Sequence, residues 1–354
     1  MSIERQLAFW LAPFAVVVLV LWLLSDILLP FVAGMVIAYL LDPVTNRLQR
    51  IGFNRRLAAF LIVGAFVLTF VALAFMLVPL LASQLYTLLA TIPGYVMRLY
   101  ELALSVEVPW LREMLGSGDT NKTFNDLVSQ GAGWVATFLR SLWSGGRALI
   151  SLLSLIVVTP VVAFYLISDW PRIVKTVEQW IPLKHREQVH ALLAEIDAAI
   201  AGFVRGQTGV CLILGSYYAL ALSFVGLNFG LLIGLLAGLL SFIPFVGSLS
   251  GLLLAVGVAI AQFWPEWTPI LIVLGIFLVG QFVEGYILSP KLVGENVGLH
   301  PVWMMFAMFA FGYLFGFVGL LVAVPVSAAI GVVLRFALRR YRASAIYTGG
   351  AVGS

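Results

Sequence analysis

Long apolar runs separated by short polar segments recur along most of the 354 residues. Within residues 1–80, three such runs cover residues 7–24, 27–41 and 57–80. Because an α-helix needs about 20 apolar residues to cross the hydrocarbon core of a bilayer, each run is interpreted as a membrane span. A signal peptide is the alternative for the first run, but no small-residue cleavage site follows it and the second run begins almost at once. We therefore predict three N-terminal transmembrane spans.

Residues 81–147 mix polar and apolar positions, with five basic and five acidic side chains. Apolar residues recur there at helical spacing, as at Leu85 and Leu89, which is typical of amphipathic helices. Pro93-Gly94 and later proline and glycine positions predict breaks between several helical pieces. We interpret the segment as an extracytoplasmic helical arm, and the alternative is a set of helices that lie in the membrane interface.

Residues 148–168 form a fourth apolar run and residues 207–225 a fifth. Between them, residues 169–206 carry many charges, and their apolar positions, such as Leu192 and Ile196, trace one face of a helix. This pattern predicts a cytoplasmic amphipathic helix that leads into the fifth span and serves as a structural brace.

Two matching stretches, 226–263 and 298–338, dominate a predicted transport core at residues 207–338. Each opens on a glycine, continues as an apolar leg and reaches the triplet Phe-Val-Gly. The phenylalanine follows the opening glycine by 19 positions in both. We interpret each stretch as two apolar helices folded on a glycine-containing bend. In membrane proteins, paired interrupted helices in corresponding halves point to a transport site.

The legs before the two bends are short, because residues 229–243 and 301–315 hold 15 residues each. A 15-residue helix is about 22 Å long, whereas the hydrocarbon core is about 30 Å thick. The legs are therefore predicted to stop within the membrane as re-entrant helices, with short tilted spans as the alternative. Glycines at every fourth position of the first leg indicate close packing of helix backbones, and they are Gly230, Gly234 and Gly238.

Arginines cluster at two places that the positive-inside rule assigns to the cytoplasm. Four lie in a loop expected at residues 42–56, after the second span, and four lie between residues 335 and 342, after the second bent pair. Both termini, including the tail at residues 339–354, are therefore expected to be cytoplasmic. The fifth span then leads outward and the run at 268–288 leads back inward, so the two bent pairs are predicted to have inverted topology.

Composition excludes several classes of protein. The chain is 62% hydrophobic and 10% charged, with a mean hydropathy of +1.08, which is far from the composition of soluble domains. We predict an all-α polytopic membrane protein. The single cysteine, Cys211, excludes an intrachain disulfide and a cysteine-based metal site. No basic stripe points to nucleic acid, and no zincin, nucleophile-elbow or P-loop pattern points to an enzyme. We expect no cofactor and no metal.

Glu284 is the only acid in the apolar run at 268–288. Gln281 precedes it by three positions, so both share a helix face. That face should point into protein, because a carboxylate that faces lipid costs a few kcal/mol. Glu284 lies about 7 Å from the predicted cytoplasmic end of the helix. It is interpreted either as a coupling residue for transport or as half of a structural ion pair, with Arg205 as its partner.

The C-terminal half contains five motifs in a fixed order: Ile243-Pro244-Phe245-Val246-Gly247, Ser289-Pro290-Lys291-Leu292-Val293-Gly294, Leu299-His300-Pro301, Phe315-Gly316-Phe317-Val318-Gly319 and Ala323-Val324-Pro325. Their order and spacing resemble the signature of the autoinducer-2 exporter family, and the resemblance extends over nearly the whole chain. It implies a bacterial inner-membrane protein of about eight spans. Some members of that family export the small quorum-sensing signal autoinducer-2, and others exchange Na+ for H+.

We therefore expect a secondary carrier that exports a small solute, with autoinducer-2, a neutral polyol, as the favoured cargo. The alternatives are a Na+(Li+)/H+ antiporter and an uncoupled channel or scaffold protein. The expected partners are the lipid bilayer, the small-molecule or cation substrate and further copies of the chain in a homo-oligomer. The two bends are expected to approach each other and frame the substrate path. The residues expected along that path or in coupling are Arg205, Asn228, Pro244, Phe245, Gly247, Gln281, Glu284, Pro290, Lys291, His300, Phe317 and Gly319.

Overall fold

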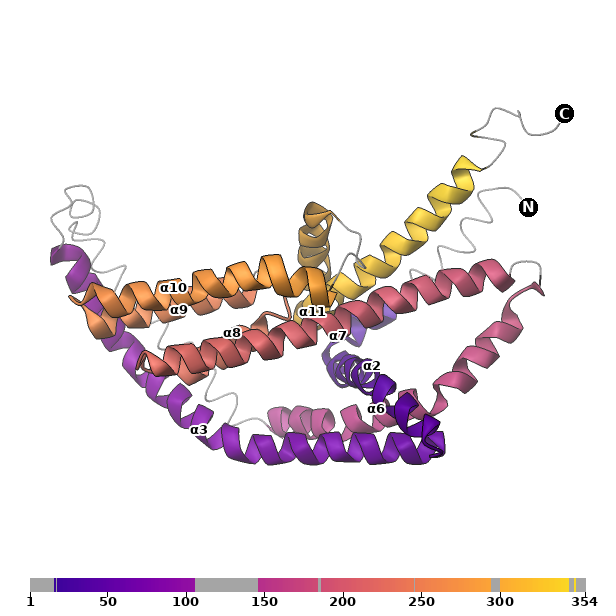
Figure 1. Cartoon of the computed structure of the whole chain (residues 1–354), viewed down its shortest axis with the longest axis horizontal. Helices are drawn as coiled ribbons and strands as arrows, with labels where there is room; N and C mark the ends of the chain where they lie inside the picture. The colour runs from indigo at the N-terminus through magenta and orange to yellow at the C-terminus, as the bar shows by residue number, and fades with distance from the viewer. Residues whose placement is uncertain are drawn as a thin grey trace. The chain divides into compact units, whose positions relative to one another are not determined.

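The computed structural model is all-helical over the residues that it describes, which are 16, 18–105, 146–183, 186–244, 246–293, 300–343 and 347 (Figure 1). Its elements in chain order are η1 (Ser25–Ile27), α2 (Leu28–Arg50), α3 (Arg55–Ser105), α6 (Gly146–Trp180), α7 (Arg186–Phe224), α8 (Gly230–Leu240), α9 (Val246–Phe263), α10 (Trp267–Val283), η3 (Glu284–Val293) and α11 (Pro301–Arg342). Seven helices of this described part are long and apolar enough to cross a membrane. The prediction of an all-α polytopic membrane protein is confirmed.

The chain forms two compact units. Unit 1 consists of Met1–Val67, Leu153–Gln207 and Pro290–Ser354, and unit 2 consists of Leu68–Leu152 and Thr208–Ser289. The first bent pair therefore belongs to unit 2 and the second to unit 1. Most of the predicted first span, at residues 7–24, lies outside the described residues.

In unit 1, α2 packs closely against α6 because the residues between them are small. A Cβ added at Gly34 would come within 2.8 Å of Cβ of Val162. The Thr159 hydroxyl of α6 donates a hydrogen bond to the Pro30 carbonyl of α2 at 3.2 Å. A buried apolar cluster joins these two helices to the start of α3, and it consists of Ala38, Ala59, Val63 and Ile167.

The polar loop expected at residues 42–56 is much shorter in the structure. α2 continues through Asp42 and Pro43, and only residues 51–54 separate it from α3. The expected loop was wrong because charged residues also occur within the solvated end of a helix. Arg47 and Arg50 instead occupy the last turn of α2, where the negative end of the helix dipole favours a cation.

α3 is one uninterrupted helix from the third predicted span into the predicted arm. Its 51 residues continue past residue 80 and past Pro93-Gly94 to Ser105. The predicted break at Pro93-Gly94 is therefore wrong, because a helix can continue past a proline with a kink although it loses one hydrogen bond and crowds the preceding turn. The rest of the arm, at residues 106–145, lies outside the described residues.

The predicted cytoplasmic helix is divided between two longer helices. α6 continues past residue 168 through Pro171 to Trp180, and α7 joins residues 186–206 to the fifth span in one helix of 39 residues. Such a helix is about 58 Å long, almost twice the thickness of a hydrocarbon core. The arginine-rich end of α11 contacts its N-terminal half, because Arg339 forms an ion pair with Glu195 at 3.1 Å.

The first bent pair consists of α8 and α9, and α9 also packs against α10 (Figure 1). α8 is only 11 residues long, so the helical part of the first leg is shorter than predicted. The chain then turns and comes back so closely that a Cβ at Gly247 would lie 2.5 Å from the Ala237 carbonyl. Only a glycine allows this return of the backbone.

The glycine row of α8 packs closely against another helix, as predicted, and that helix is α7. A Cβ added at Gly230 would come within 2.9 Å of the Leu222 backbone, and one at Gly238 would collide with the backbone of Gly215. The two helices therefore approach each other backbone to backbone, which increases van der Waals contact where no hydrophobic force between helices is available.

The second bend lies inside α11, which changes direction at Gly316 with φ 59° and ψ −138°. This conformation is essentially confined to glycine because it has no Cβ. After the bend, a Cβ at Gly319 would collide with the Phe311 carbonyl. Gly319 therefore allows the backbone to return close to the preceding leg, as Gly247 does in the first bend. The prediction of two glycine-centred bends is confirmed, whereas their opposite orientation in a membrane stays a prediction.

We expect Gly247→Ala to lower the thermal stability of the purified protein by several °C, because the added methyl group meets backbone atoms that cannot yield. Gly257→Ala is the matched control in the same helix, since a Cβ there meets nothing within 4 Å. That control should leave stability unchanged or raise it, because alanine favours a helix by about 1 kcal/mol over glycine. Equal melting temperatures for the two variants would contradict the close return at Gly247.

Candidate functional site

The first bend places two serines in its interior. Ser241 is 2% exposed and its hydroxyl donates to the Ala237 carbonyl at 2.8 Å. Ser248, in the first turn of α9, is 8% exposed, and its hydroxyl has no hydrogen-bond partner among the described residues. The first amides of a helix also lack partners within the helix. The bend therefore presents a free hydroxyl and the start of a helix within an apolar region.

The two serines were missed by sequence reasoning, although both lie within a few residues of the predicted bend. Of the predicted residues there, Pro244 is half-buried and Gly247 is buried. Phe245 lies outside the described residues.

Asn228 belongs to the turn that leads into α8. Its backbone amide donates to the Gln262 side chain at 2.8 Å, and Gln262 donates in return to the Gly226 carbonyl at 2.9 Å. The Asn228 side chain donates to the Tyr95 hydroxyl at 3.2 Å. These contacts connect the start of α8 with the end of α9, while the predicted contact of Asn228 with a substrate stays a prediction.

Glu284 lies at the end of α10 and is half-buried. The Gln281 side chain donates to its carboxylate at 3.3 Å, which is the shared helix face that the sequence predicts. One turn earlier, Gly280 packs against the ring of Tyr218 from α7. The Tyr218 ring stacks on Phe277 with 4.5 Å between the centroids.

The Tyr218 hydroxyl is the one buried side-chain polar atom of the described residues that has no hydrogen-bond partner. Leaving such a group unpaired costs about 1–3 kcal/mol, and an unpaired group of this kind needs an explanation such as a functional role or a bound water. The sequence shows only a tyrosine in an apolar span, so Tyr218 was missed. It joins Gln281 and Glu284 as a candidate site residue of unit 2.

The chain leaves α10 as a π-helix, η3, which covers Glu284–Val293 and contains Pro290 and Lys291. π-Helical segments are rare and frequently occur at functional sites. No sequence signal distinguishes them from α-helix, so η3 was not predicted. In unit 1, the backbone at the end of η3 lies against the backbone of α7, because a Cβ added at Gly206 of α7 would collide with the Leu292 carbonyl.

The remaining predicted residues of the second bent pair lie in unit 1. His300 precedes α11 and its Nδ1 accepts a hydrogen bond from the Val302 amide at 3.4 Å, so it acts as an N-cap. Phe317 is largely exposed and follows the bend. No observation tests whether these residues line a substrate path, which stays a prediction.

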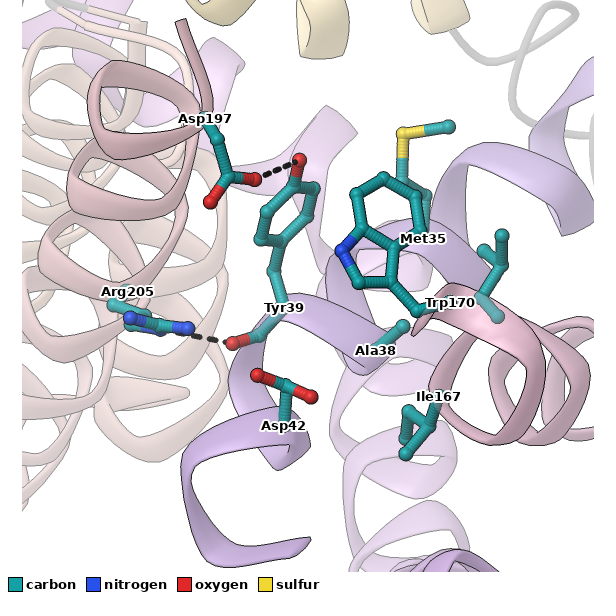
Figure 2. Close-up of a pocket in the computed structure, with 9 residues that line it drawn as sticks. Met35, Ala38, Tyr39, Asp42, Ile167, Trp170, Asp197 and Arg205 are labelled. Atoms are coloured by element: carbon teal, nitrogen blue, oxygen red, sulfur yellow. Dashed lines mark hydrogen bonds between the residues drawn. The ribbon is translucent and has the colours of Figure 1, made fainter. Parts of the chain in front are cut away.

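Arg205 binds α2 in the structure. Its Nε donates to the Tyr39 carbonyl at 2.9 Å, and the Tyr39 hydroxyl donates to Asp197 of α7 at 3.0 Å (Figure 2). Two hydrogen bonds of opposite direction thus join one tyrosine of α2 to α7. The ion pair predicted between Arg205 and Glu284 would join residues of different units and stays a prediction.

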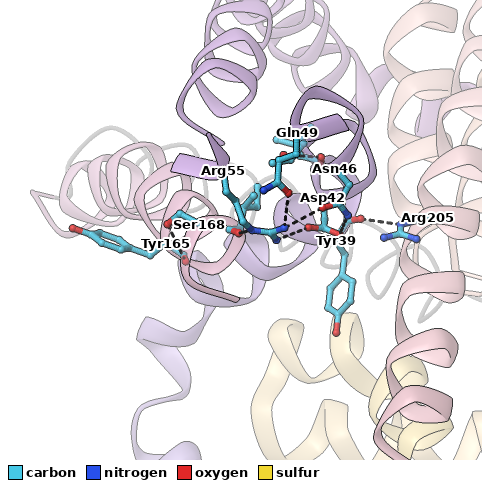
Figure 3. A network of polar contacts seen from close by, with 11 residues as sticks. Tyr39, Asp42, Asn46, Gln49, Arg55, Tyr165, Ser168 and Arg205 are labelled. Carbon is cyan, nitrogen blue, oxygen red and sulfur yellow. Dashed lines mark hydrogen bonds and ion pairs between the residues drawn. The ribbon is translucent and has the colours of Figure 1, made fainter. Parts of the chain in front are cut away.

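Arg55 is the centre of a second polar network in unit 1 (Figure 3). Its guanidinium forms an ion pair with Asp42 at 3.0 Å and donates to the Ile167 carbonyl of α6 at 2.7 Å. It also donates to Asn46 and Gln49 of α2, both at 3.0 Å. One arginine at the start of α3 therefore fixes the C-terminal part of α2 against the interior of α6.

Apolar helices of membrane-spanning length, together with two helix pairs that are folded on glycines, define a multi-pass membrane protein with interrupted helix pairs. The chain belongs to the AI-2E family of transporters, whose family model matches residues 11–339. The predicted family membership is confirmed. This family is a class of transporters and permeases, not a class of enzymes.

Curated relatives match over most of their length. The chain is 31% identical to YrrI of Bacillus subtilis (strain 168), over 90% of this chain and 89% of the relative. It is 28% identical to PerM of Escherichia coli (strain K12), over 89% and 88%. It is 25% identical to the AI-2 transport protein TqsA of the same strain, over 88% and 86%.

We expect Arg55→Lys to destabilise the protein by about 2–3 kcal/mol, because an ammonium cannot replace four hydrogen bonds made by a largely buried guanidinium. Arg56→Lys is the matched control, since Arg56 is exposed and uses only its backbone amide, which donates to the Asn54 side chain. Thermal unfolding in detergent measures both variants. A loss of stability that is equal in both would rule out a special role for the Arg55 network.

Proposed function

We propose that the protein is a secondary carrier of the bacterial inner membrane that exports a small neutral polar solute, with autoinducer-2 as the first candidate. The observation that carries this proposal is the interrupted helix pair α8–α9, with the unpartnered Ser248 hydroxyl at its bend. The relation to the AI-2 transport protein TqsA, at 25% identity, supports the same class of cargo.

The chemistry of the bends favours a neutral solute over an ion. Residues 241–248 and 312–319 contain no Asp, Glu, Lys, Arg or His. A polyol needs hydroxyl and amide partners and apolar walls, whereas an ion needs a counter-charge. Backbone that leaves a helix within a membrane is tolerated where it is buried in protein or lines a water-filled cavity. A hydroxylated solute would satisfy the free groups of such a bend.

The remaining parts of the proposal concern orientation and assembly. The arginines at the end of α2 and of α11 support cytoplasmic termini, by the positive-inside rule. The many large apolar side chains exposed on α3, such as Phe60, Leu68 and Phe75, offer surface for lipid and for further copies of the chain. We therefore retain a homo-oligomer as part of the proposal.

A second candidate function is the exchange of Na+ or Li+ for H+. Glu284 favours it, because it is a half-buried carboxylate in a membrane-spanning helix, beside a π-helix and near the unpaired Tyr218 hydroxyl. Ionisable residues in such positions commonly belong to ion pathways.

Transport by the purified protein in proteoliposomes distinguishes the candidates. A carrier of autoinducer-2 should show saturable uptake of the labelled compound and faster uptake when unlabelled compound is present on the other side. A channel saturates weakly and shows no such acceleration. When a Na+ gradient is imposed, an ion exchanger should instead move H+ in the direction opposite to Na+, and it should do so without autoinducer-2. Absence of labelled autoinducer-2 flux in a protein that exchanges Na+ for H+ would overturn the first candidate.

For the neutral cargo, we expect Ser248→Ala to raise the KM for autoinducer-2 roughly fivefold to tenfold, which corresponds to one lost hydrogen bond of about 1–1.5 kcal/mol. Ser250→Ala is the control, because the Ser250 hydroxyl already donates to the Val246 carbonyl at 2.6 Å. Initial rates of counterflow at several concentrations give both constants. A KM that responds equally to the two substitutions would speak against a substrate contact at Ser248.

For a coupling role, we expect Glu284→Gln to abolish or sharply reduce transport while the protein still inserts and assembles. Glu266→Gln, which removes an exposed acid at the other end of α10, should leave transport unchanged. A changed pH dependence in Glu284→Gln would indicate proton coupling. If flux persists while stability falls, and Arg205→Gln behaves in the same way, Glu284 is a structural residue only.

A further inference from the structure

Unit 1 contains a cavity of ≈ 220 Å³ between α2, α6 and α7 (Figure 2). One part of its wall is apolar and is formed by Met35, Leu166, Ile167 and Trp170. The opposite part is polar, because Tyr39, Asp42, Asp197 and Arg205 line it as well. Of its lining residues, only Arg205 is among those predicted for the substrate path or coupling, and the cavity itself has no part in the proposed transport path.

A second cavity of ≈ 330 Å³ adjoins the first along α2. It is strongly basic, since its wall contains Arg47, Arg50 and Arg205 together with Asp42 and Asn46. Asp42 and Arg205 line both cavities. The two cavities therefore share two wall residues, and together they offer one feature with an apolar end and a cationic end.

The carboxylates of this feature are engaged by other side chains. The Asp42 carboxylate accepts hydrogen bonds from Arg55 at 3.0 Å and from Asn46 at 2.8 Å. The Asp197 carboxylate accepts a hydrogen bond from the Tyr39 hydroxyl. Among the described residues, Arg47 and Arg50 have no hydrogen-bond or ion-pair partner. Arg205 uses only its Nε, so its two terminal nitrogens are free. The cationic end can therefore bind an anion with three guanidinium groups.

The lining residues of α2 extend over a length comparable with the thickness of one membrane leaflet. Met35 and Arg50 are 15 positions apart on α2, which is about 22 Å along the helix. One leaflet with its headgroups is about 20–22 Å thick, half of a bilayer. Trp170, which is 40% exposed, adds a large aromatic surface to the apolar end. The arginines follow at the end of α2 that the positive-inside rule places in the cytoplasm.

We propose that these two cavities bind an anionic phospholipid of the cytoplasmic leaflet. The phosphate lies among Arg47, Arg50 and Arg205, and an acyl chain lies against Met35, Ile167 and Trp170. Basic pockets between membrane helices on the cytoplasmic side suit such headgroups. A soluble anion would use the arginines but would have no use for the apolar wall. The bound lipid would fill the space between α2, α6 and α7 and stabilise their contact.

The test compares the full-length protein in nanodiscs of phosphatidylcholine alone with nanodiscs that also contain phosphatidylglycerol. We expect phosphatidylglycerol to raise the melting temperature by several °C and to remain bound to the protein in native mass spectrometry. The double variant Arg47→Gln/Arg50→Gln should bind it roughly tenfold more weakly and lose most of the gain in stability. The control Arg56→Gln/Arg342→Gln removes the same charge from two exposed arginines outside the cavities and should keep both effects.

Three outcomes would overturn the proposal. Phosphatidylcholine could protect as well as phosphatidylglycerol, which would exclude recognition of an anionic headgroup. Inorganic phosphate or glycerol 3-phosphate could protect as well as the lipid, which would assign the site to a soluble anion. The two double variants could lose phosphatidylglycerol to the same degree, which would reduce the effect to net charge. If the cavity double variant does not assemble, Arg50→Gln alone, in the exposed last turn of α2, makes the same comparison with Arg56→Gln.

Discussion

Close approach of one backbone to another at glycine is the constraint on which both bent helix pairs depend. At Gly247 and Gly319 the chain returns so closely to the preceding leg that any side chain would meet a carbonyl oxygen. Gly316 adds a backbone conformation that has no room for a Cβ. A membrane offers no hydrophobic force to hold apolar helices together. Tight backbone contact therefore supplies the packing, and it does so only where side chains are absent.

Polar contacts complement this packing in unit 1. Arg55 and Arg205 each donate to a backbone carbonyl of a neighbouring helix, at 2.7 Å and 2.9 Å. Both lie at helix positions that the sequence places near the cytoplasmic surface, where a guanidinium can remain partly solvated while it binds. A buried ion pair in the membrane interior would be costly. Glycine contacts and arginine contacts therefore complement each other, since the first need no side chain and the second need a long charged one.

The bends and the membrane class could be predicted from the sequence because each rests on a residue with one main structural use. Glycine marks the turns, and long apolar runs mark the spans. Helix ends were less predictable. The charges after Asp42 indicated a loop, yet α2 continues to Arg50 because a helix tolerates charge wherever its surface is solvated. η3 and the unpaired hydroxyls of Ser248 and Tyr218 could not be predicted, since π-helix and the absence of a partner have no sequence pattern.

The hydroxyls of Ser248 and Tyr218, which have no hydrogen-bond partner among the described residues, favour a solute-binding site over a purely structural core in unit 2. A phenylalanine at 218 would remove a buried polar group that has no partner, and such a change is often neutral or stabilising in a packed interior. A protein that keeps the Tyr218 hydroxyl among apolar helices forgoes that stability. This loss of stability is explained if a solute or a water molecule forms a hydrogen bond with the Tyr218 hydroxyl during transport. One hydroxyl lies at a broken helix and the other beside Glu284, and interrupted helices and intramembrane carboxylates are where transport sites commonly occur in membrane proteins.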